Sequence, residues 1–450
     1  MAGPGASADG VGRRDFLKSA GIAGAGFMVV GRQVLGGAGF KAPGEKLNIA
    51  GIGVGGMGFA NLKECEGENI VALCDVDDAY AAKAFARYPK ARRHRDFRRM
   101  LEVQKDIDAV VIATPDHTHA VIALAAMSLG KHVYVQKPLA RTIGETRLLS
   151  AAARRFKVAT QMGNQGHSME GIRLIKEWID AGAIGPVREV HCWTDRPMGW
   201  WPQGVERPRE TPDPPATLDW DLWLGPAPAR PYHPAYHPFK WRGWWDFGTG
   251  ALGDMGCHLF DAPFWALDLG HPTSVEATST PVNGETAPLG SMVHYRFPAR
   301  GVHPPVTLTW YEGGLRPPRP VELEDDRPLG SKNGGLLLVG DTGKIMASEE
   351  NARNPRLLPE TAMTAFRQPP RTIPRIHGSH EQDWIRACKG GPPAGSNFDY
   401  AAPLTELVLL GNLALRTGKK LYWDGPNLRV TNVPEANAFV RAEARAGWGL

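Results

Sequence analysis

The stretch Leu47-Asn48-Ile49-Ala50-Gly51-Ile52-Gly53-Val54-Gly55-Gly56-Met57-Gly58 decides the fold of this chain. Its apolar first half predicts a buried strand, and Gly53, Gly55 and Gly58 fit the pattern G-x-G-x-x-G at the start of a helix. A frame that begins two residues earlier also fits, but we prefer the later one because Ile52 completes the strand. Glycines in such a turn let the backbone approach a pyrophosphate at a helix N-terminus. We therefore expect a dinucleotide to contact Gly53, Gly55, Gly56, Met57 and Gly58.

An acidic residue follows at the expected distance. Asp75 lies 22 residues after Gly53, at the end of the next predicted strand, residues 69–74. A carboxylate there accepts hydrogen bonds from the ribose 2′- and 3′-hydroxyls and repels a 2′-phosphate. The sequence therefore predicts NAD as cofactor, with NADP less favoured.

Strands and helices alternate through the following hundred residues. Further strands are predicted at residues 108–113, 132–135 and 157–162, and helices at residues 59–66, 77–87, 119–129 and 143–156. The strands are almost continuously apolar, as parallel strands buried on both faces require. This alternation predicts an α/β Rossmann domain with a doubly wound parallel sheet over residues 42–165.

The pattern changes after Gly163. Residues 202–238 hold ten prolines in 37 residues, which excludes regular structure and predicts a long ordered excursion, placed within residues 197–245. Helices are predicted at residues 171–183, 379–389 and 402–416, and strands at residues 187–193, 274–280, 291–297, 306–311 and 336–339. These elements predict an α+β second domain, residues 166–450, with a large, mostly antiparallel open sheet.

Two segments follow later predicted strands of the first domain, where an open α/β sheet binds its ligand. The first supplies Thr114, Pro115, His117 and His119, and the second supplies Gln136 and Lys137. We expect these six residues to line the cofactor. For the two histidines, capping of a helix is the alternative.

Asp254 and His258 are four residues apart in a predicted helix, residues 252–265, so they share one face. Imidazole suits removal of a proton from a substrate hydroxyl, and a carboxylate one turn away would orient the ring or relay its proton. Lys137 would bind the same oxygen and stabilise a developing alkoxide. Alone, His258 would more often be a satisfied core histidine, but the three residues together predict a catalytic set.

Nine of the fourteen tryptophans lie between Trp193 and Trp265. Indole faces stack on the C–H faces of sugars, so the cluster favours a carbohydrate pocket. Any single tryptophan fits a buried core or a subunit interface instead. The candidate substrate contacts are Asn164, Arg196, His237, Lys240, Trp241, Arg242 and Trp244.

These motifs resemble those of the Gfo/Idh/MocA oxidoreductases, which include glucose-fructose oxidoreductase and inositol dehydrogenases. The resemblance rests on the glycine fingerprint, on residues 114–119 and 130–139, and on Gly253-Asp254-Met255-Gly256-Cys257-His258. It covers residues 46–270 by motif and the remainder by architecture.

The resemblance implies a Rossmann domain followed by an open sheet whose face covers the nicotinamide and holds a sugar or cyclitol. It also implies Lys137, Asp254 and His258 as the catalytic set, and a homo-oligomer. The family's usual Glu-Lys-Pro is Gln136-Lys137-Pro138 here. The amide still forms hydrogen bonds, but it adds no negative charge beside Lys137.

The N-terminus resembles a bacterial twin-arginine export signal. Gly12-Arg13-Arg14-Asp15-Phe16-Leu17-Lys18 precedes a Gly- and Ala-rich apolar stretch, residues 20–31, too short to span a membrane. We expect residues 1–41 to be signal and linker, the export machinery to be a partner, and the protein to be periplasmic or exported. Without a working signal the expected location is the cytoplasm. Export of folded protein favours NAD that stays bound and is regenerated in each cycle, as in epimerisation, transhydrogenation or oxidation-assisted glycoside cleavage.

Composition excludes several other classes. A net charge of +5, 42% hydrophobic and 22% charged residues are ordinary for a soluble enzyme. The basic run in residues 90–99 accompanies no nucleic-acid-binding motif and predicts a solvated surface. Five scattered cysteines indicate neither a disulfide framework nor a metal site. No long apolar span follows residue 41. Together these features predict no nucleic-acid partner, no metal site and no membrane span.

Three hypotheses remain open at this stage. The first is a sugar oxidoreductase with tightly held NAD and a redox-neutral outcome. The second is a conventional sugar or cyclitol dehydrogenase with exchangeable NAD. The third is a non-catalytic carbohydrate- or nucleotide-binding protein on the same scaffold, against which Lys137, Asp254 and His258 argue.

Overall fold

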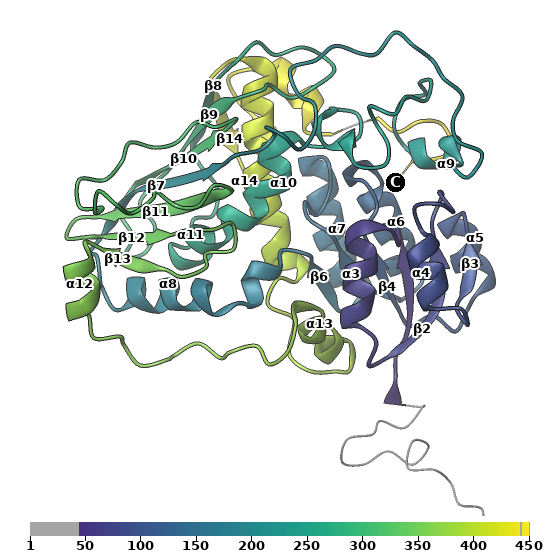
Figure 1. Ribbon diagram of the computed structural model, residues 1–450, viewed down its shortest axis with the longest axis horizontal. Coiled ribbons are helices and arrows are strands. Elements are labelled where there is room, and N and C mark those ends of the chain that lie inside the picture. Colours follow the sequence, from purple (N-terminus) through teal and green to yellow (C-terminus); the bar gives the residue numbers. More distant parts are fainter. Residues whose placement is uncertain (1–44, 442, 450) are drawn as a thin grey trace, which may run out of the picture. The chain divides into compact units, whose positions relative to one another are not determined.

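A computed structural model describes residues 45–441 and 443–449 (Figure 1). From Leu47 onward the described residues form one compact unit. The predicted export signal, residues 1–41, lies outside the described residues.

A six-stranded, fully parallel sheet forms the first half, in the order β3-β2-β1-β4-β5-β6. Its strands are β1 (Asn48–Ile52), β2 (Asn69–Cys74), β3 (Arg92–His94), β4 (Ala109–Ile112), β5 (His132–Val135) and β6 (Thr160–Met162). The intervening helices are α3 (Gly56–Glu64), α4 (Ala82–Arg87), α5 (Phe97–Val103), α6 (Asp116–Ser128) and α7 (Ile143–Phe156). The predicted doubly wound Rossmann fold is confirmed. The short edge strand β3 was not predicted, because the arginines that form it are exposed and carry no apolar signal.

A nine-stranded sheet forms the second half, in the order β13-β12-β11-β7-β10-β9-β8-β14-β15. Its strands are β7 (Val187–Thr194), β8 (Ser274–Ser279), β9 (Ser291–Phe297), β10 (Val306–Glu312), β11 (Gly334–Gly340), β12 (Lys344–Ala347), β13 (Arg356–Leu358), β14 (Leu421–Asp424) and β15 (Arg429–Val430). Only the pairing of β7 with β10 is parallel, so the predicted mostly antiparallel sheet is confirmed. The helices are α8 (Glu170–Asp180), α9 (Trp220–Leu224), α10 (Gly250–Leu259), α11 (Asp261–Ala266), α12 (Glu360–Ala365), α13 (His380–Cys388) and α14 (Phe398–Thr417).

Helices from the end of the chain complete the packing of the parallel sheet. Trp384 and Ile385 of α13 are buried in one core cluster with Ile49, Leu73 and Val111 of the parallel strands. Helices α10 and α14 lie between the two sheets (Figure 1), and α14 contacts both α7 and β8. The two sheets therefore share their packing, which fixes α10 beside the Rossmann strands.

The proline-rich excursion is largely irregular, and it folds around its own apolar cluster. Besides α9 it holds a short 3₁₀ helix, Lys240–Gly243. Six of the nine clustered tryptophans are buried, so the interpretation of the whole cluster as a carbohydrate pocket needs correction. The buried residues of this cluster are Leu218, Trp223, Leu224, Ala227, Tyr236, Trp241, Trp244 and Phe247.

Candidate active site

The glycine turn between β1 and α3 has almost no room for side chains. Gly53 has a φ of +75°, and a Cβ there would meet the Ala113 backbone at 2.8 Å. A Cβ at Gly58 would lie 1.8 Å from the carbonyl oxygen of Gly53, while Gly55 caps α3. Gly53 therefore makes the tight turn, Gly55 allows the close approach, and Gly58 allows the close packing of the helix. These are the glycines of the later of the two frames.

The turn fits a dinucleotide pyrophosphate. Helix α3 begins without a side-chain cap and without an acidic residue in its first turn, which suits an anion at its N-terminus. Asp75, at the end of β2, accepts hydrogen bonds from the backbone N–H of Val54 (2.8 Å), Gly55 (3.4 Å) and Asp77 (3.0 Å). Burial raises the pKa of Asp75 to about 6, although these hydrogen bonds oppose the shift.

A cavity of about 280 Å³ runs from this turn to the end of β5. Tyr80 also lines it, and its ring packs closely against the turn. A Cβ at Gly55 would lie only 2.2 Å from that ring. The cavity brings together most of the residues proposed from the sequence. Those that line it are Gly53, Gly55, Gly56, Met57, Asp75, Thr114, Pro115, Gln136, Lys137, His237, Trp241, Arg242 and Asp254.

Lys137 and Asp254 form an ion pair at one end of this cavity. Lys137 Nζ lies 2.8 Å from Asp254 Oδ1, and Arg242 Nε lies 3.1 Å from the same oxygen. Burial alone would raise the pKa of Asp254, but the charges of Lys137 and Arg242 outweigh it and hold that pKa well below its usual range. Asp254 is therefore ionised at neutral pH, and two cations share its charge.

His258 lies one turn after Asp254 on α10, whose bounds confirm the predicted helical spacing. Its Nδ1 is buried and, within the described part of the chain, has no hydrogen-bond partner. Burial lowers the pKa of His258 to about 3, and the positive charge of Lys137 adds to this effect. The ring is therefore neutral at physiological pH, and His258 does not line the cavity.

We expect the ring of His258 to stay neutral across the range where an ordinary histidine titrates. Because its pKa is lowered from 6.5 to about 3, its ¹⁵N shifts should be those of neutral imidazole from about pH 8 to about pH 5. The measurement is a histidine-selective NMR titration, with His258→Gln to assign the signal. Half-protonation near pH 6.5 would contradict the buried environment described above.

Asp116 belongs to this cavity and was missed by sequence reasoning. It begins α6 and accepts a hydrogen bond from Thr249 Oγ1 (2.7 Å). Burial raises its pKa to about 7, against the opposing hydrogen bond and the charge of Lys137. The available signal was its position as the first residue after Pro115 at the end of β4, which the neighbouring histidines obscured.

His117 and His119 correct the prediction of cofactor contacts. Both are 1% exposed, and their ring nitrogens face backbone carbonyls. His117 contacts Phe247 (3.2 Å) and Trp223 (3.0 Å), and His119 contacts Pro138 (2.9 Å) and Thr114 (2.8 Å). Neither lines the cavity. These rings connect α6 to neighbouring segments through hydrogen bonds. Their role is structural, although neither ring caps α6.

Three substrate candidates also lie elsewhere. Asn164 is fully buried and bonds Asp261 and Ser396. Trp244 is 1% exposed, and its indole N–H donates to the Ala235 carbonyl (2.9 Å). Arg196 pairs with its neighbour Asp195 (2.6 Å) and stacks on Trp200. None of the three lines the cavity, and neither does the exposed Lys240.

Comparison with known proteins divides the chain into the same two parts, a Rossmann domain and a C-terminal domain. Residues 47–164 match the model of an oxidoreductase family with an NAD-binding Rossmann fold, and residues 170–297 match the C-terminal α/β domain of that family. The chain belongs to the Gfo/Idh/MocA oxidoreductase family. Its Rossmann domain is therefore an NAD-binding domain, as the glycine turn and Asp75 predicted.

Curated members of the family match over part of their length. Levoglucosan dehydrogenase of Pseudarthrobacter phenanthrenivorans is 25% identical over 56% of this chain and 53% of its own. The α-N-acetylgalactosaminidase of Shewanella oneidensis is 29% identical over 38% of this chain and 43% of its own. The chain thus spans about half the length of these relatives.

A solved structure supports the fold over a longer range. The WlbA dehydrogenase of Bordetella pertussis, in complex with NADH and UDP-GlcNAcA, has a TM-score of 0.59 at 17% identity. The match covers 84% of this chain and 99% of that one. Within residues 45–441 and 443–449, no cluster could hold a metal ion, and no helix is long and apolar enough to cross a membrane.

The departure from the family's Glu-Lys-Pro has a structural explanation. Gln136 Nε2 donates to Asn61 Oδ1 (2.9 Å), and Asn61 Nδ2 donates to Glu381 Oε1 (2.7 Å). Tyr134 also donates to that carboxylate (3.1 Å). The carboxyl group of this network thus belongs to Glu381 of α13, and Gln136 is the donor that the Asn61 carbonyl needs.

We therefore expect Gln136→Glu to destabilise this family member. A carboxylate at 136 would face the Asn61 carbonyl, and turning that amide round would break its bond to Glu381. Leaving a buried polar group without a partner costs about 1–3 kcal/mol. Urea unfolding of the NAD-free protein measures the loss, with the exposed Gln368→Glu as matched control. Equal stability of the two variants would refute the network's role.

Proposed function

We propose that this protein oxidises a hydroxyl of a sugar, glycoside or cyclitol with NAD, and that the NAD stays bound and is regenerated in each cycle. One observation carries the proposal: the Lys137–Asp254 pair lines the same cavity as the glycine turn. That turn fits a dinucleotide, and the pair fits an ionising hydroxyl.

The binding roles follow from the contacts. The amides at the start of α3 would hold the pyrophosphate, and Asp75 would hold the ribose hydroxyls with the lone pairs that its backbone hydrogen bonds leave over. When bound, nicotinamide supplies the acceptor for the hydrogen that leaves the substrate carbon. Thr114, Pro115 and Gln136 border the path from the turn to Lys137.

Lys137 and Asp254 lie at the second end of the cavity, and His258 follows one turn later on α10 without lining it. Lys137 Nζ would donate a hydrogen bond to the substrate oxygen and stabilise its developing charge. Neutral His258 would accept the hydroxyl proton through a water. Asp254 holds Lys137 in position, and Arg242 shares that carboxylate, so the site needs no rearrangement as charge develops.

The substrate class is supported by the cavity wall and by the relatives. Trp241 and Arg242 line the cavity beside Asp254, and an aromatic face beside a guanidinium suits a ring that carries several hydroxyls. Levoglucosan dehydrogenase and α-N-acetylgalactosaminidase are names of carbohydrate enzymes. The second of these names a glycosidase, which supports a redox-neutral reaction on this scaffold.

Export would make retained NAD necessary. The arginine pair Arg13-Arg14 and the apolar stretch after it support transport through the twin-arginine route and a periplasmic location. Free NAD is scarce outside the cytoplasm, so cofactor loaded before export would have to serve repeatedly. A dehydrogenase with exchangeable NAD is the alternative.

Native mass spectrometry of protein purified without added NAD tests this proposal. We expect the mass of one NAD per chain, and turnover of a sugar or glycoside, followed by product NMR, without added cofactor. A preparation that lacks NAD and makes free NADH on a sugar panel would establish the exchangeable alternative. Retained NAD without turnover of any sugar or cyclitol would instead indicate a binding protein.

A further inference from the structure

A second cavity, of about 200 Å³, lies outside the proposed active site. It is bordered by the start of α7, by residues 245–249, by helix α14, and by Ala438, Phe439, Arg441 and Glu443. Three arginines line it, Arg141, Arg416 and Arg441, together with two carboxylates, Asp246 and Glu443. Neither the sequence motifs nor the proposed reaction uses these residues.

Within the described residues, Arg141 and Arg416 form no ion pair. Among the residues that the structure describes, Arg416 has no hydrogen bond or ion pair, and it lies over Phe439 at 3.9 Å. Burial lowers the pKa of Arg416 to about 10, and the positive charge of Arg141 contributes. Arg141 donates to the Trp245 carbonyl (3.1 Å), while its Nε is buried without a partner. Two guanidinium groups therefore repel each other in a poorly solvated place.

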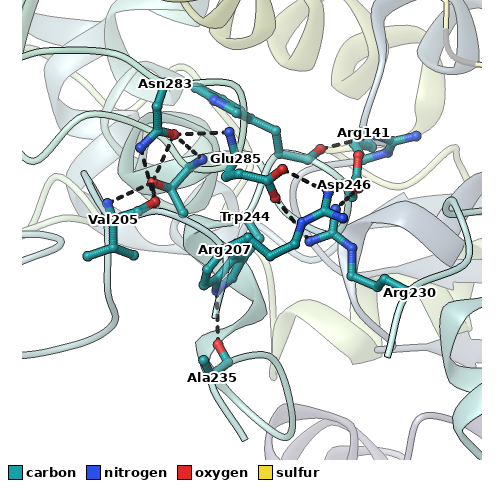
Figure 2. Close-up of polar contacts among 11 residues, drawn as sticks. Arg141, Val205, Arg207, Arg230, Ala235, Trp244, Asp246, Asn283 and Glu285 are labelled. Atoms are coloured by element: carbon teal, nitrogen blue, oxygen red, sulfur yellow. Dashed lines mark hydrogen bonds and ion pairs between the residues drawn. The ribbon is translucent and has the colours of Figure 1, made fainter. Parts of the chain in front are cut away.

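Three carboxylates lie near this pair, and each has other partners or lies in solvent. Glu145 interacts with the charge of Arg141 and accepts two hydrogen bonds from Thr142. Figure 2 shows Asp246 bound to Arg230, which also contacts Glu285. Asp246 only partly offsets the shift in Arg416, because its charge is already shared with Arg230. Glu443 is exposed to solvent. Among the described residues, no carboxylate therefore bonds Arg416 at the cavity wall.

Two further polar groups of the wall lack a hydrogen-bond partner in the described structure. Trp245 is 5% exposed, and its indole N–H is buried without an acceptor in the described structure. Asn412 donates to the Thr249 carbonyl (2.8 Å), whereas its Oδ1 is buried without a donor. Leu409 and Leu413 supply apolar walls. Buried polar groups are normally satisfied, so this wall suits a ligand that accepts hydrogen bonds.

We propose that this cavity binds a small oxyanion of the phosphate or carboxylate class. Both guanidinium groups line the cavity; a planar guanidinium group binds two oxygens of one anion, and a bound anion would reduce the repulsion between Arg141 and Arg416. The site borders the active site, because Thr249 lines this cavity and bonds Asp116 in the other.

Calorimetry with inorganic phosphate tests the site in protein saturated with NAD, so that the turn at α3 is occupied and cannot take the phosphate. At constant ionic strength in chloride, we expect saturable binding at millimolar phosphate. Arg416→Gln should weaken it at least about tenfold, and Arg416→Lys should weaken it less, because the charge remains but the fork is lost. The control is Arg155→Gln, on exposed α7 surface beside Phe156, and it should bind as the native chain does.

Thermal unfolding checks that the variants fold. Without phosphate, Arg416→Gln should melt no lower than the native protein, because it removes a repulsion, and phosphate should no longer raise its melting temperature. Malonate in place of phosphate distinguishes the two classes: binding of either anion, lost in Arg416→Gln, supports the site. Binding of neither anion, or equal binding by Arg416→Gln and the native chain, would overturn it.

Discussion

Lys137→Ala should lower kcat/KM for the sugar substrate about 10²- to 10³-fold, which is the usual cost of removing one preorganised donor from a developing oxyanion. Lys137 Nζ lies at the cavity end, bound to Asp254 at 2.8 Å, so the loss should appear mainly in kcat. NAD binding should change little, because the glycine turn and Asp75 hold the other end. Steady-state kinetics and NAD titration measure the two effects separately.

The exposed Lys105→Ala serves as control for this variant, since it removes the same charge far from the cavity lining. Its kinetics should equal those of the native protein. If Lys137→Ala kept kcat within about tenfold of the native value, the lysine would not stabilise charge in the reaction, and its role would be limited to pairing with Asp254.

Asp254→Ala should reduce the free energy of unfolding by about 3 kcal/mol, because removing one member of a buried ion pair leaves the other charge uncompensated. Here two cations are affected: Lys137 and Arg242 both bond the same Asp254 oxygen. The side chains of Lys137 and Asp254 are 13% and 14% exposed, so water compensates little of the loss. Urea unfolding of the NAD-free protein measures it.

The double variant Lys137→Met with Asp254→Leu separates charge imbalance from lost packing. If charge is the cause, the double variant should recover much of the stability that Asp254→Ala loses, and the cycle with the two single variants should show strong coupling. Strictly additive losses across the cycle would show that the pair contributes no interaction energy.

The parts that sequence predicted correctly have local causes. The parallel strands are almost wholly apolar, so β1, β2 and β4 were visible as short runs before helical segments. The turn glycines were identifiable because no other residue fits at Gly53 or Gly58. The four-residue spacing of Asp254 and His258 places both on one face of α10 wherever that helix lies.

The parts that sequence missed depend on contacts between distant segments. Asp116 lines the cavity and is held there by Thr249, 133 residues away in the sequence. His117 is held by the carbonyls of Trp223 and Phe247. No local sequence pattern predicts these contacts. The tryptophans of residues 193–265 carry the same composition signal in a core as in a sugar pocket, and only burial separates the two.

Helix α13 gives the clearest case of a long-range effect. It comes late in the chain, yet its Trp384 and Ile385 complete the core of the parallel sheet, and its Glu381 bonds Asn61. The role of Gln136 depends on that contact. The substitution of the family's glutamate was therefore visible in the sequence, while its reason was not.

A crystal structure of the protein with NAD tests most directly whether one cavity joins the glycine turn to the Lys137–Asp254 pair. We expect the pyrophosphate against the amides at the start of α3, the ribose at Asp75, and the nicotinamide ring beside Lys137. His258 should lie toward the face of that ring that is left open for the substrate. A dinucleotide bound elsewhere, or a nicotinamide ring turned away from Lys137, would contradict the proposed enzyme.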